Sequence, residues 1–227
     1  MREINAIAFD LDHTLYDRNA TWSALTERFQ DEFQVSCSSA QLCRKLQDAD
    51  YISTYEESSW RGMLEKLQHW EILSPEITFI QFDTFIRRYF PEAIVPYDDT
   101  YFILDWCHIN GLQPSLITNG HTGLQERKLS CMHLDQAFEV CIICNLDNGV
   151  PCKPAREPFM QLSTLLNLSP EHILYVGDNP INDIAGAAGC GMQTAWLNIM
   201  HNWKVSVPKP TFEINRLSEL PALILGR

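Results

Sequence analysis

The sequence has no apolar run near the roughly 20 residues that a helix needs to cross a bilayer. Its first residues, Met1-Arg2-Glu3, lead into a short strand-like run and lack the pattern of a signal peptide. Basic residues are few: 17 lysines and arginines stand against 29 aspartates and glutamates, a formal net charge of −12. Nucleic acids and acidic membranes bind clustered cations, so the composition argues against both as partners. We therefore expect a cytoplasmic protein and leave a small anionic substrate open.

Cysteine occurs at eight of 227 positions, which is too sparse for a disulfide scaffold. Only Cys141, Cys144 and Cys152 are close enough to suggest metal spacing. The first two lie in an apolar run, and no second cysteine pair or histidine pair follows at the distance typical of a zinc finger. We therefore expect reduced, mostly buried thiols rather than a zinc site.

Short apolar runs alternate with segments that can be helical over much of the chain. Such alternation is typical of an α/β fold with a doubly wound parallel sheet and right-handed crossovers. Residues 1–15 and 96–227 are predicted to form this α/β core. The expected strands cover residues 4–9, 115–118, 140–144, 173–176 and 194–197, and the expected helices cover 98–108, 122–131, 157–167 and 182–188.

Residues 16–95 break the alternation and are predicted to be successive helices. Apolar side chains recur there at helical spacing in three stretches. Ser39 and Ser74 are the expected N-caps of two of these helices. Aromatic stripes of this kind usually belong to a core, so we expect packing rather than ligand binding. The stretches are Trp22, Leu25, Phe29 and Phe33; Trp60, Met63, Leu64 and Leu67; and Phe79, Phe82, Ile86 and Tyr89.

Polar residues follow the first, second and fourth of the predicted strands, and a lysine lies in the loop after the third. Each group alone has an ordinary explanation, such as a capped turn or a surface lysine. The carboxyl ends of parallel strands meet at one edge of a sheet, so this fold would bring the groups together. The groups are Asp10, Asp12 and Thr14; Thr118 and Asn119; Lys153; and Gly177, Asp178 and Asp183.

In this order the residues resemble the motifs of the haloacid dehalogenase (HAD) superfamily. Those motifs are DxDxT, a hydroxyl residue that ends the second strand, a lysine, and GDxxxxD. The resemblance covers the entire predicted core and implies a Rossmann-like sheet. The helical insert looks like the α-helical cap domain of the subfamily that carries it between the first and second motifs.

The resemblance also implies an activity. It implies a magnesium-dependent phosphatase that cleaves a small phosphorylated metabolite, with Asp10 as nucleophile and Asp12 as general acid and base. Dehalogenases of the superfamily lack this acid, so Asp12 favours phosphoryl transfer over carbon–halogen cleavage. The other implied roles are phosphate binding for Thr118, Asn119 and Lys153, binding of Mg²⁺ by Asp10, the carbonyl of Asp12 and Asp178, and support from Thr14 and Asp183.

Several alternatives stay open. Residues 117–120, followed by Gln125 and Lys128-Leu129, are similar to the nucleotidase-like branch, which implies a nucleoside 5′-monophosphate as substrate. Phosphoglycolate or a sugar phosphate is the alternative substrate. A phosphotransferase and a catalytically silent binding module are the alternative functions, and the complete acidic set argues against the silent module.

Four further polar residues adjoin the motifs. His13 and His121 could face a substrate, but the ordinary expectation is that they pack locally or face solvent. Asn179 and Asn182 either orient the acidic loop or form its turn.

Overall fold

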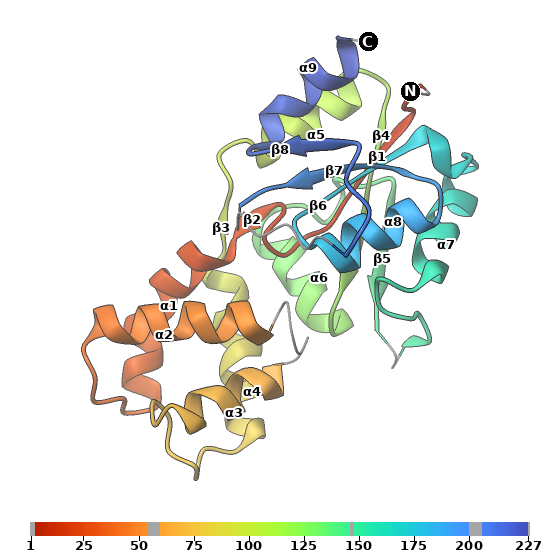
Figure 1. The fold of residues 1–227 in the computed structure, drawn as a ribbon. Helices are drawn as coiled ribbons and strands as arrows, with labels where there is room; N and C mark the ends of the chain where they lie inside the picture. Colours follow the sequence, from red (N-terminus) through yellow and green to blue (C-terminus); the bar gives the residue numbers. More distant parts are fainter. Residues whose placement is uncertain (1–2, 54–59, 146–147, 200–205, 227) are drawn as a thin grey trace. The chain divides into compact units, whose positions relative to one another are not determined.

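The computed structural model of the chain describes residues 3–53, 60–145, 148–199 and 206–226. The chain divides into two compact units, Met1–Tyr16 with Pro96–Arg227 and Asp17–Val95. The polypeptide passes between the units through β2 (Tyr16–Asp17) and β3 (Val95–Pro96), which pair in a two-stranded sheet (Figure 1). The larger unit thus joins an N-terminal strand to a long C-terminal segment.

The larger unit is built on a six-stranded sheet of order β5-β4-β1-β6-β7-β8, and every pairing in it is parallel. From the central strand β1 the chain adds strands first on one side and then on the other. This arrangement confirms the predicted doubly wound α/β fold. The strands are β1 (Ala6–Phe9), β4 (Gln113–Asn119), β5 (Val140–Cys144), β6 (Ile173–Gly177), β7 (Gln193–Leu197) and β8 (Phe212–Ile214).

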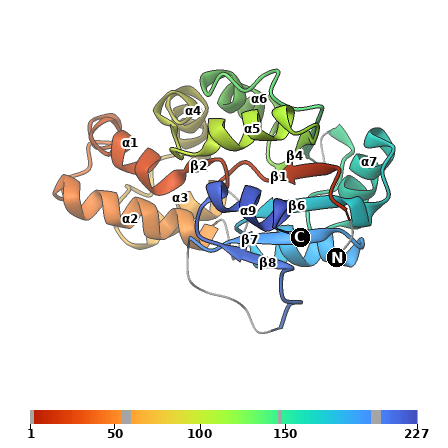
Figure 2. The same cartoon turned by 90° about the horizontal axis from the view of Figure 1, so that it is seen from above.

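Helices cover both faces of this sheet, and Figure 2 shows α5 and α6 on one side of the strands and α8 on the other. Strands enclosed in this way are apolar on both faces, and all residues of β1 and β6 are buried. The helices are α5 (Thr100–Ile109), α6 (Thr122–Cys131), α7 (Arg156–Leu166), α8 (Gly186–Gly189) and α9 (Leu220–Leu225), with 3₁₀ turns at Pro170–His172 and Leu217–Glu219 and a π-helix at Pro180–Ala185.

One predicted helix of the larger unit differs in kind. The segment expected at residues 182–188 begins as a π-helix, Pro180–Ala185, and continues as the single turn of α8. Asn179 caps the segment by accepting from the backbone N–H groups of Ile181 and Asn182. A Cβ atom at Gly186 would lie 2.7 Å from the ring of Phe159, so the glycine permits close packing of this turn. Strand β8 and helix α9 are too short to leave a clear pattern in the sequence.

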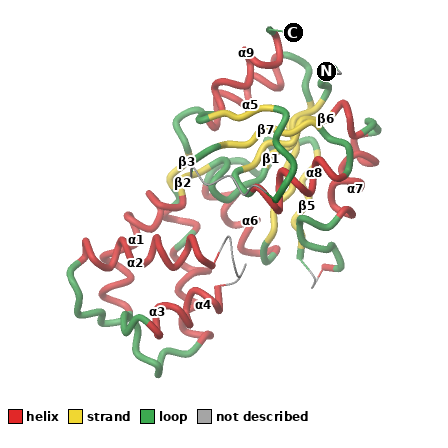
Figure 3. Tube along the Cα trace, viewed as in Figure 1, coloured by secondary structure: helices red, strands yellow, loops and turns green. Residues whose placement is uncertain are grey.

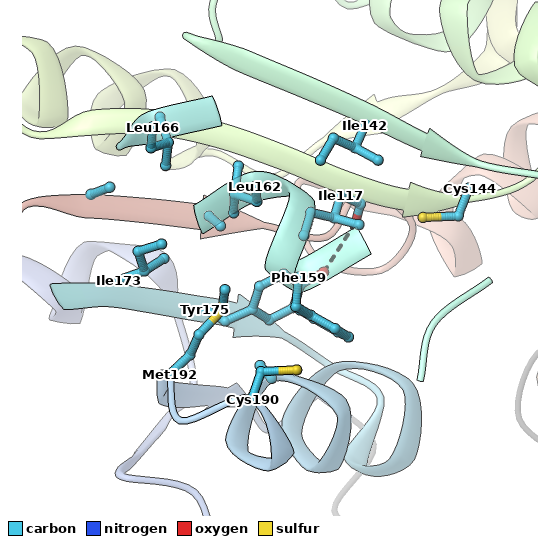
Figure 4. Packing of buried hydrophobic residues seen from close by; sticks show 13 residues of the cluster. Ile117, Ile142, Cys144, Phe159, Leu162, Leu166, Ile173, Tyr175, Cys190 and Met192 are labelled. Carbon is cyan, nitrogen blue, oxygen red and sulfur yellow. Dashed lines mark hydrogen bonds between the residues drawn. The ribbon is translucent and has the colours of Figure 1, made fainter. Parts of the chain in front are cut away.

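Helix α7 packs on the sheet against β5 and β4 and reaches β6 through one aromatic side chain. Its Phe159 meets the ring of Tyr175 edge to face at a centroid distance of 5.2 Å. Both rings belong to a buried cluster that includes Ile117 and Ile142 (Figure 4). Dense packing of this kind holds strand ends rigidly, which matters because polar side chains follow these strands.

The smaller unit consists of the helices α1 (Arg18–Glu32), α2 (Ser39–Ile52), α3 (Trp60–His69) and α4 (Phe79–Tyr89), drawn in red in Figure 3, and a 3₁₀ turn at Pro91–Ala93. Trp22 is fully buried and packs against Phe29 and Phe90. Trp60 also contacts Trp22, at a centroid distance of 6.2 Å. The expectation that these aromatic stripes form a core is confirmed. No helix in the described ranges, in either unit, is long and apolar enough to cross a membrane.

The predicted N-caps Ser39 and Ser74 are wrong. Helix α2 is capped by Ser38 and α4 by Thr78, each in a capping box with a glutamine three residues later. The glutamine at the third position distinguishes Ser38 from its neighbour. Ser74 lies five residues before α4 begins, and its hydroxyl accepts instead from the backbone N–H of Glu76 in a turn.

Candidate active site

The strand register brings the predicted polar groups to one edge of the sheet. Phe9, the last residue of β1, pairs with Leu116 of β4 on one side and Val176 of β6 on the other. Asp10 continues the ladder, because its backbone N–H donates to the carbonyl of Val176 at 2.9 Å. The residues that follow these three strands are therefore neighbours, although up to 168 positions separate Asp10 and Asp178 in the chain.

Lys153 links two of the acids. Its ammonium donates to Asp10 Oδ1 at 2.6 Å and to Asp183 Oδ1 at 2.7 Å. It also contacts the hydroxyl of Tyr175 and the carbonyl of Ile117, both at 2.9 Å. Burial alone would lower the pKa of Lys153, but the two carboxylates raise that pKa well above its ordinary value. The lysine therefore stays charged inside the site.

Asn119 fixes the loop that carries this lysine. The resemblance implies that Asn119 binds phosphate, and the structure shows a further role for its side chain. Asn119 Oδ1 accepts from the backbone N–H of Lys153 at 2.8 Å, and Nδ2 donates to the carbonyl of Lys153 at 3.0 Å. The end of β4 thus holds the lysine loop at two points.

Three buried carboxylates gather beside the lysine. Asp10, Asp178 and Asp183 each offer an oxygen, and these oxygens lie within 4.8 Å of one another. Burial raises the pKa of Asp10 to about 7; Lys153 opposes this rise, and the charges of Asp183 and Asp12 add to it. The hydroxyl of Thr14 lies 3.5 Å from Asp10 Oδ2 and 3.4 Å from Asp178 Oδ1, so it can donate to either.

A cation suits this cluster. Carboxylate oxygens, with waters, are the ligands that Mg²⁺ prefers, and the oxygen-only donor set here matches that preference. A positive ion would also relieve the repulsion that the nearby carboxylates exert on Asp10. Among the residues that the structure describes, this is the one group of histidine, cysteine or acidic side chains close enough to hold a metal. Cys141, Cys144 and Cys152 are free thiols.

The loop after β6 presents two of the acids. Asp183 Oδ2 accepts from the backbone N–H of Asn179 at 2.9 Å, which folds the loop back on itself. A Cβ atom at Gly177 would lie 2.5 Å from the side chain of Asp183, so only glycine fits there. The carbonyl of Asp178 accepts from Trp196 Nε1 at 2.8 Å. Asn179 caps the turn through Oδ1 and holds Asp183 through its backbone N–H, so it both forms the turn and orients the acidic loop.

Asp12 is held separately from Asp10. Its Oδ1 accepts from Lys128 Nζ at 2.6 Å and from the hydroxyl of Tyr16. Its Oδ2 accepts from Gln125 Nε2 at 2.9 Å, and the same nitrogen lies 2.7 Å from Thr118 Oγ1. The structure thus brings every predicted site residue to this edge of the larger unit.

Sequence reasoning missed several residues of the site. From the sequence, Gln125 and Lys128 stand out only through their similarity to the nucleotidase-like branch. Tyr175 and Trp196 lie in predicted strands, and no role in the site was predicted for them. A signal existed for Tyr175, because a tyrosine hydroxyl in a buried strand needs a hydrogen-bond partner. Gln125 and Lys128 lie three residues apart on a predicted helix and so share one face, but the sequence does not say what that face meets.

The two histidines differ. His13 is buried and adopts a left-handed backbone conformation with φ 63°, whereas His121 is exposed immediately before α6. The burial of His13 fits local packing, and His121 faces solvent next to Asn119 and Gly120 at the end of β4.

A family model described as haloacid dehalogenase-like hydrolase matches residues 7–197. The chain therefore belongs to the haloacid dehalogenase-like hydrolases, and the predicted family and enzyme class are confirmed.

Three relatives share between 20% and 33% of the matched residues with this chain. The glyceraldehyde 3-phosphate phosphatase of Pyrococcus furiosus is 27% identical over 99% of this chain and 93% of the relative. The pyrimidine 5′-nucleotidase YjjG of Escherichia coli is 33% identical over 110 residues, 48% of each chain. Among solved structures, the magnesium-bound HAD-hydrolase YfnB of Bacillus subtilis matches with a TM-score of 0.79 and 20% identity, covering 98% of this chain and 99% of that one. The last likeness concerns the fold.

Proposed function

We propose that this enzyme is a magnesium-dependent phosphomonoester hydrolase that acts on small phosphorylated metabolites through an aspartyl phosphate on Asp10. The observation that carries the proposal is the contact of one buried ammonium, Lys153 Nζ, with both Asp10 and Asp183, next to the carboxylate of Asp178. A nucleophile, a cation that can bind phosphate and a set of metal ligands then lie together. The relative named as a glyceraldehyde 3-phosphate phosphatase supports the same reading.

The carboxylates of Asp10 and Asp178 and the backbone carbonyl of Asp12 would hold Mg²⁺, with Asp183 and Thr14 in support. When bound, the ion offsets the repulsion between the carboxylates and the phosphate. The close, oxygen-only cluster of Asp10, Asp178 and Asp183 is the feature that supports this assignment.

The side chains of the site divide the reaction between them. A carboxylate oxygen of Asp10 forms a bond to phosphorus as the bond to the ester oxygen breaks, and Asp12 gives its proton to that leaving oxygen. Water then attacks the phosphorus of the aspartyl phosphate and gives a proton to Asp12. Inorganic phosphate leaves, and Asp10 is free again. Lys153 and the hydroxyl of Thr118 hold the phosphate oxygens meanwhile.

The substrate class rests on chemistry and on relatives. A net charge of −12 supports a small anionic metabolite rather than a nucleic acid or a membrane as the partner. The resemblance to the pyrimidine 5′-nucleotidase favours a nucleoside 5′-monophosphate as the first candidate. The glyceraldehyde 3-phosphate phosphatase, similar over nearly the full chain, favours a sugar or triose phosphate as the second.

Phosphate release from a panel of esters tests both levels of the proposal. The panel contains nucleoside 5′-monophosphates, sugar and triose phosphates, phosphoglycolate and p-nitrophenyl phosphate, each with Mg²⁺ and with Asp10→Asn as the blank. We expect hydrolysis by the wild type and none by Asp10→Asn, and the ranking of kcat/KM identifies the class. A wild type that releases no more phosphate than the blank contradicts the proposed activity.

A further inference from the structure

Helix α6 buries two polar side chains that face the site. Gln125 and Lys128 are 1% and 2% exposed, and they lie one helical turn apart. Buried lysines are rare, because the desolvation of an ammonium costs several kcal/mol unless a carboxylate compensates. Here Lys128 Nζ lies 2.6 Å from Asp12 Oδ1. The compensating carboxylate is therefore Asp12, two residues after Asp10.

We infer that Lys128 is a positioning residue for proton transfer by Asp12, and that Gln125 couples Asp12 to the phosphate-binding hydroxyl of Thr118. The inference rests on the proposed function and goes beyond it, because the proposal itself requires only Asp12. The two aspartates that follow β1 are each paired with a different lysine, Asp10 with Lys153 and Asp12 with Lys128.

Lys128 acts on Asp12 in two ways. With the hydroxyl of Tyr16 it holds Oδ1, which leaves the carboxyl group few orientations. Its positive charge also stabilises the carboxylate that Asp12 becomes when the proton passes to the leaving oxygen. The side chain of Asp12 is 14% exposed and that of Lys128 is 2% exposed, so water screens this interaction weakly.

Gln125 joins the acid to the phosphate pocket. Its Nε2 lies 2.9 Å from Asp12 Oδ2, 2.7 Å from Thr118 Oγ1 and 3.0 Å from the carbonyl of Asn119. An amide nitrogen carries two protons, so it serves these three acceptors by sharing. Because Gln125 donates to Thr118 Oγ1, the proton of that hydroxyl remains available for a phosphate oxygen. One side chain thus sets the spacing between proton donor and phosphate binder.

The dependence of rate on the leaving group tests the role of Lys128. An alkoxide needs a proton as it leaves, whereas p-nitrophenolate does not. The value of kcat/KM reports the steps up to formation of the aspartyl phosphate and leaves out its later hydrolysis. For Lys128→Met we expect kcat/KM to fall at least about tenfold more for an alkyl phosphate, such as a nucleoside 5′-monophosphate, than for p-nitrophenyl phosphate. The ratio of the two values does not depend on the fraction of folded enzyme.

Matched variants complete the test. Lys128→Arg keeps the charge and should recover part of the kcat/KM for the alkyl phosphate that Lys128→Met loses. Arg127→Met removes an exposed cation of the same helix and should leave kcat/KM for both esters unchanged. Gln125→Met should lower kcat/KM for both esters, because the contact to Thr118 is lost as well. An unchanged kcat/KM for both esters would overturn the role of Gln125 in coupling Asp12 to Thr118.

Two outcomes separate the inference from the function. Equal losses on the two esters in Lys128→Met, with an active wild type, overturn the positioning role alone. A wild type that is no more active than Asp10→Asn overturns the proposed function, and the inference falls with it.

Discussion

The side-chain amide of Asn119 pairs with the backbone of Lys153, accepting from its N–H at 2.8 Å and donating to its carbonyl at 3.0 Å. This pairing joins the end of β4 to a loop 34 residues further along the chain. The ammonium of Lys153 reaches Asp10 and Asp183 from that loop. The position of the buried charge therefore depends on a neutral side chain that does not touch it.

Asn119→Ala should release the lysine loop. We expect a loss of about 1–3 kcal/mol in the free energy of unfolding, because two hydrogen bonds disappear, and a roughly 10- to 100-fold loss in kcat/KM, because the ammonium moves away from Asp10. Chemical denaturation and phosphate release measure the two effects. Asn119→Asp keeps the acceptor for the N–H and loses the donor, so its values should fall between those of the wild type and alanine. An alanine variant with wild-type activity would show that the pairing has no effect on the site.

The stability of the metal-free protein should depend on pH through Asp10. Its pKa is raised from 3.8 to about 7 in the folded state, mainly by burial. The folded protein then binds this proton more tightly than the unfolded chain, so the contribution of Asp10 to stability is fully present below pH 4 and is lost as the pH rises through about 7. Asp10→Asn lacks this titration. In EDTA its advantage over the wild type should grow from near zero at pH 4 to roughly 2–4 kcal/mol above pH 7. Parallel pH profiles of the two proteins by chemical denaturation would contradict the raised pKa.

Magnesium should both activate and stabilise the enzyme. We expect EDTA to abolish phosphate release and Mg²⁺ to restore it. At 100 times its dissociation constant the ion should add about 2.7 kcal/mol, which raises the melting temperature by several degrees. Asp178→Asn removes one of the three clustered carboxylates and should lose most of that thermal shift. The exposed Asp135→Asn serves as control and should retain the shift. An equal shift in both variants would place the ion elsewhere.

Gly177→Ala should damage the acidic loop. The added methyl group would lie 2.5 Å from the side chain of Asp183, so the acid must move away from Lys153 or the strand must shift. We expect about 1–3 kcal/mol of destabilisation and a weaker response to Mg²⁺. Gly189→Ala is the matched control, since a methyl group added there would meet no atom within 4 Å and the residue is exposed in α8. Similar melting temperatures for the two variants would rule out the close contact as the reason for the glycine.

Part of the site follows directly from the sequence. Asp10, Thr118 and Asp178 end apolar runs, and strand ends of a parallel sheet must meet, so their proximity is predictable. Lys153 follows only from the combination of motifs, because a single loop lysine is ordinary. The partners of Asp12 are not predictable in this way. Lys128 and Gln125 lie 116 and 113 residues from it in the chain, and a helix face does not state which strand end it approaches.

The errors have similar causes. Serine at either of two neighbouring positions can cap a helix, and the structure selects Ser38 through its glutamine partner. The segment after Asp178 has helical residues, yet it begins as a π-helix capped by Asn179, and its Gly186 packs closely on Phe159; propensity records neither feature. Local preference decides such segments less than the packing around them.

The pairing of β2 with β3 has a consequence for divergence among related enzymes. Tyr16–Asp17 and Val95–Pro96 lie side by side where the chain leaves and re-enters the sheet-bearing unit. The helices between them close over an aromatic core of their own, with Arg18 and Asp50 as a buried ion pair. Helices in this interval can therefore be lengthened, replaced or redesigned while β1, the strand that leads to Asp10, keeps its neighbours in the sheet. Sequence change in one stretch then need not disturb the arrangement of side chains that another stretch supplies.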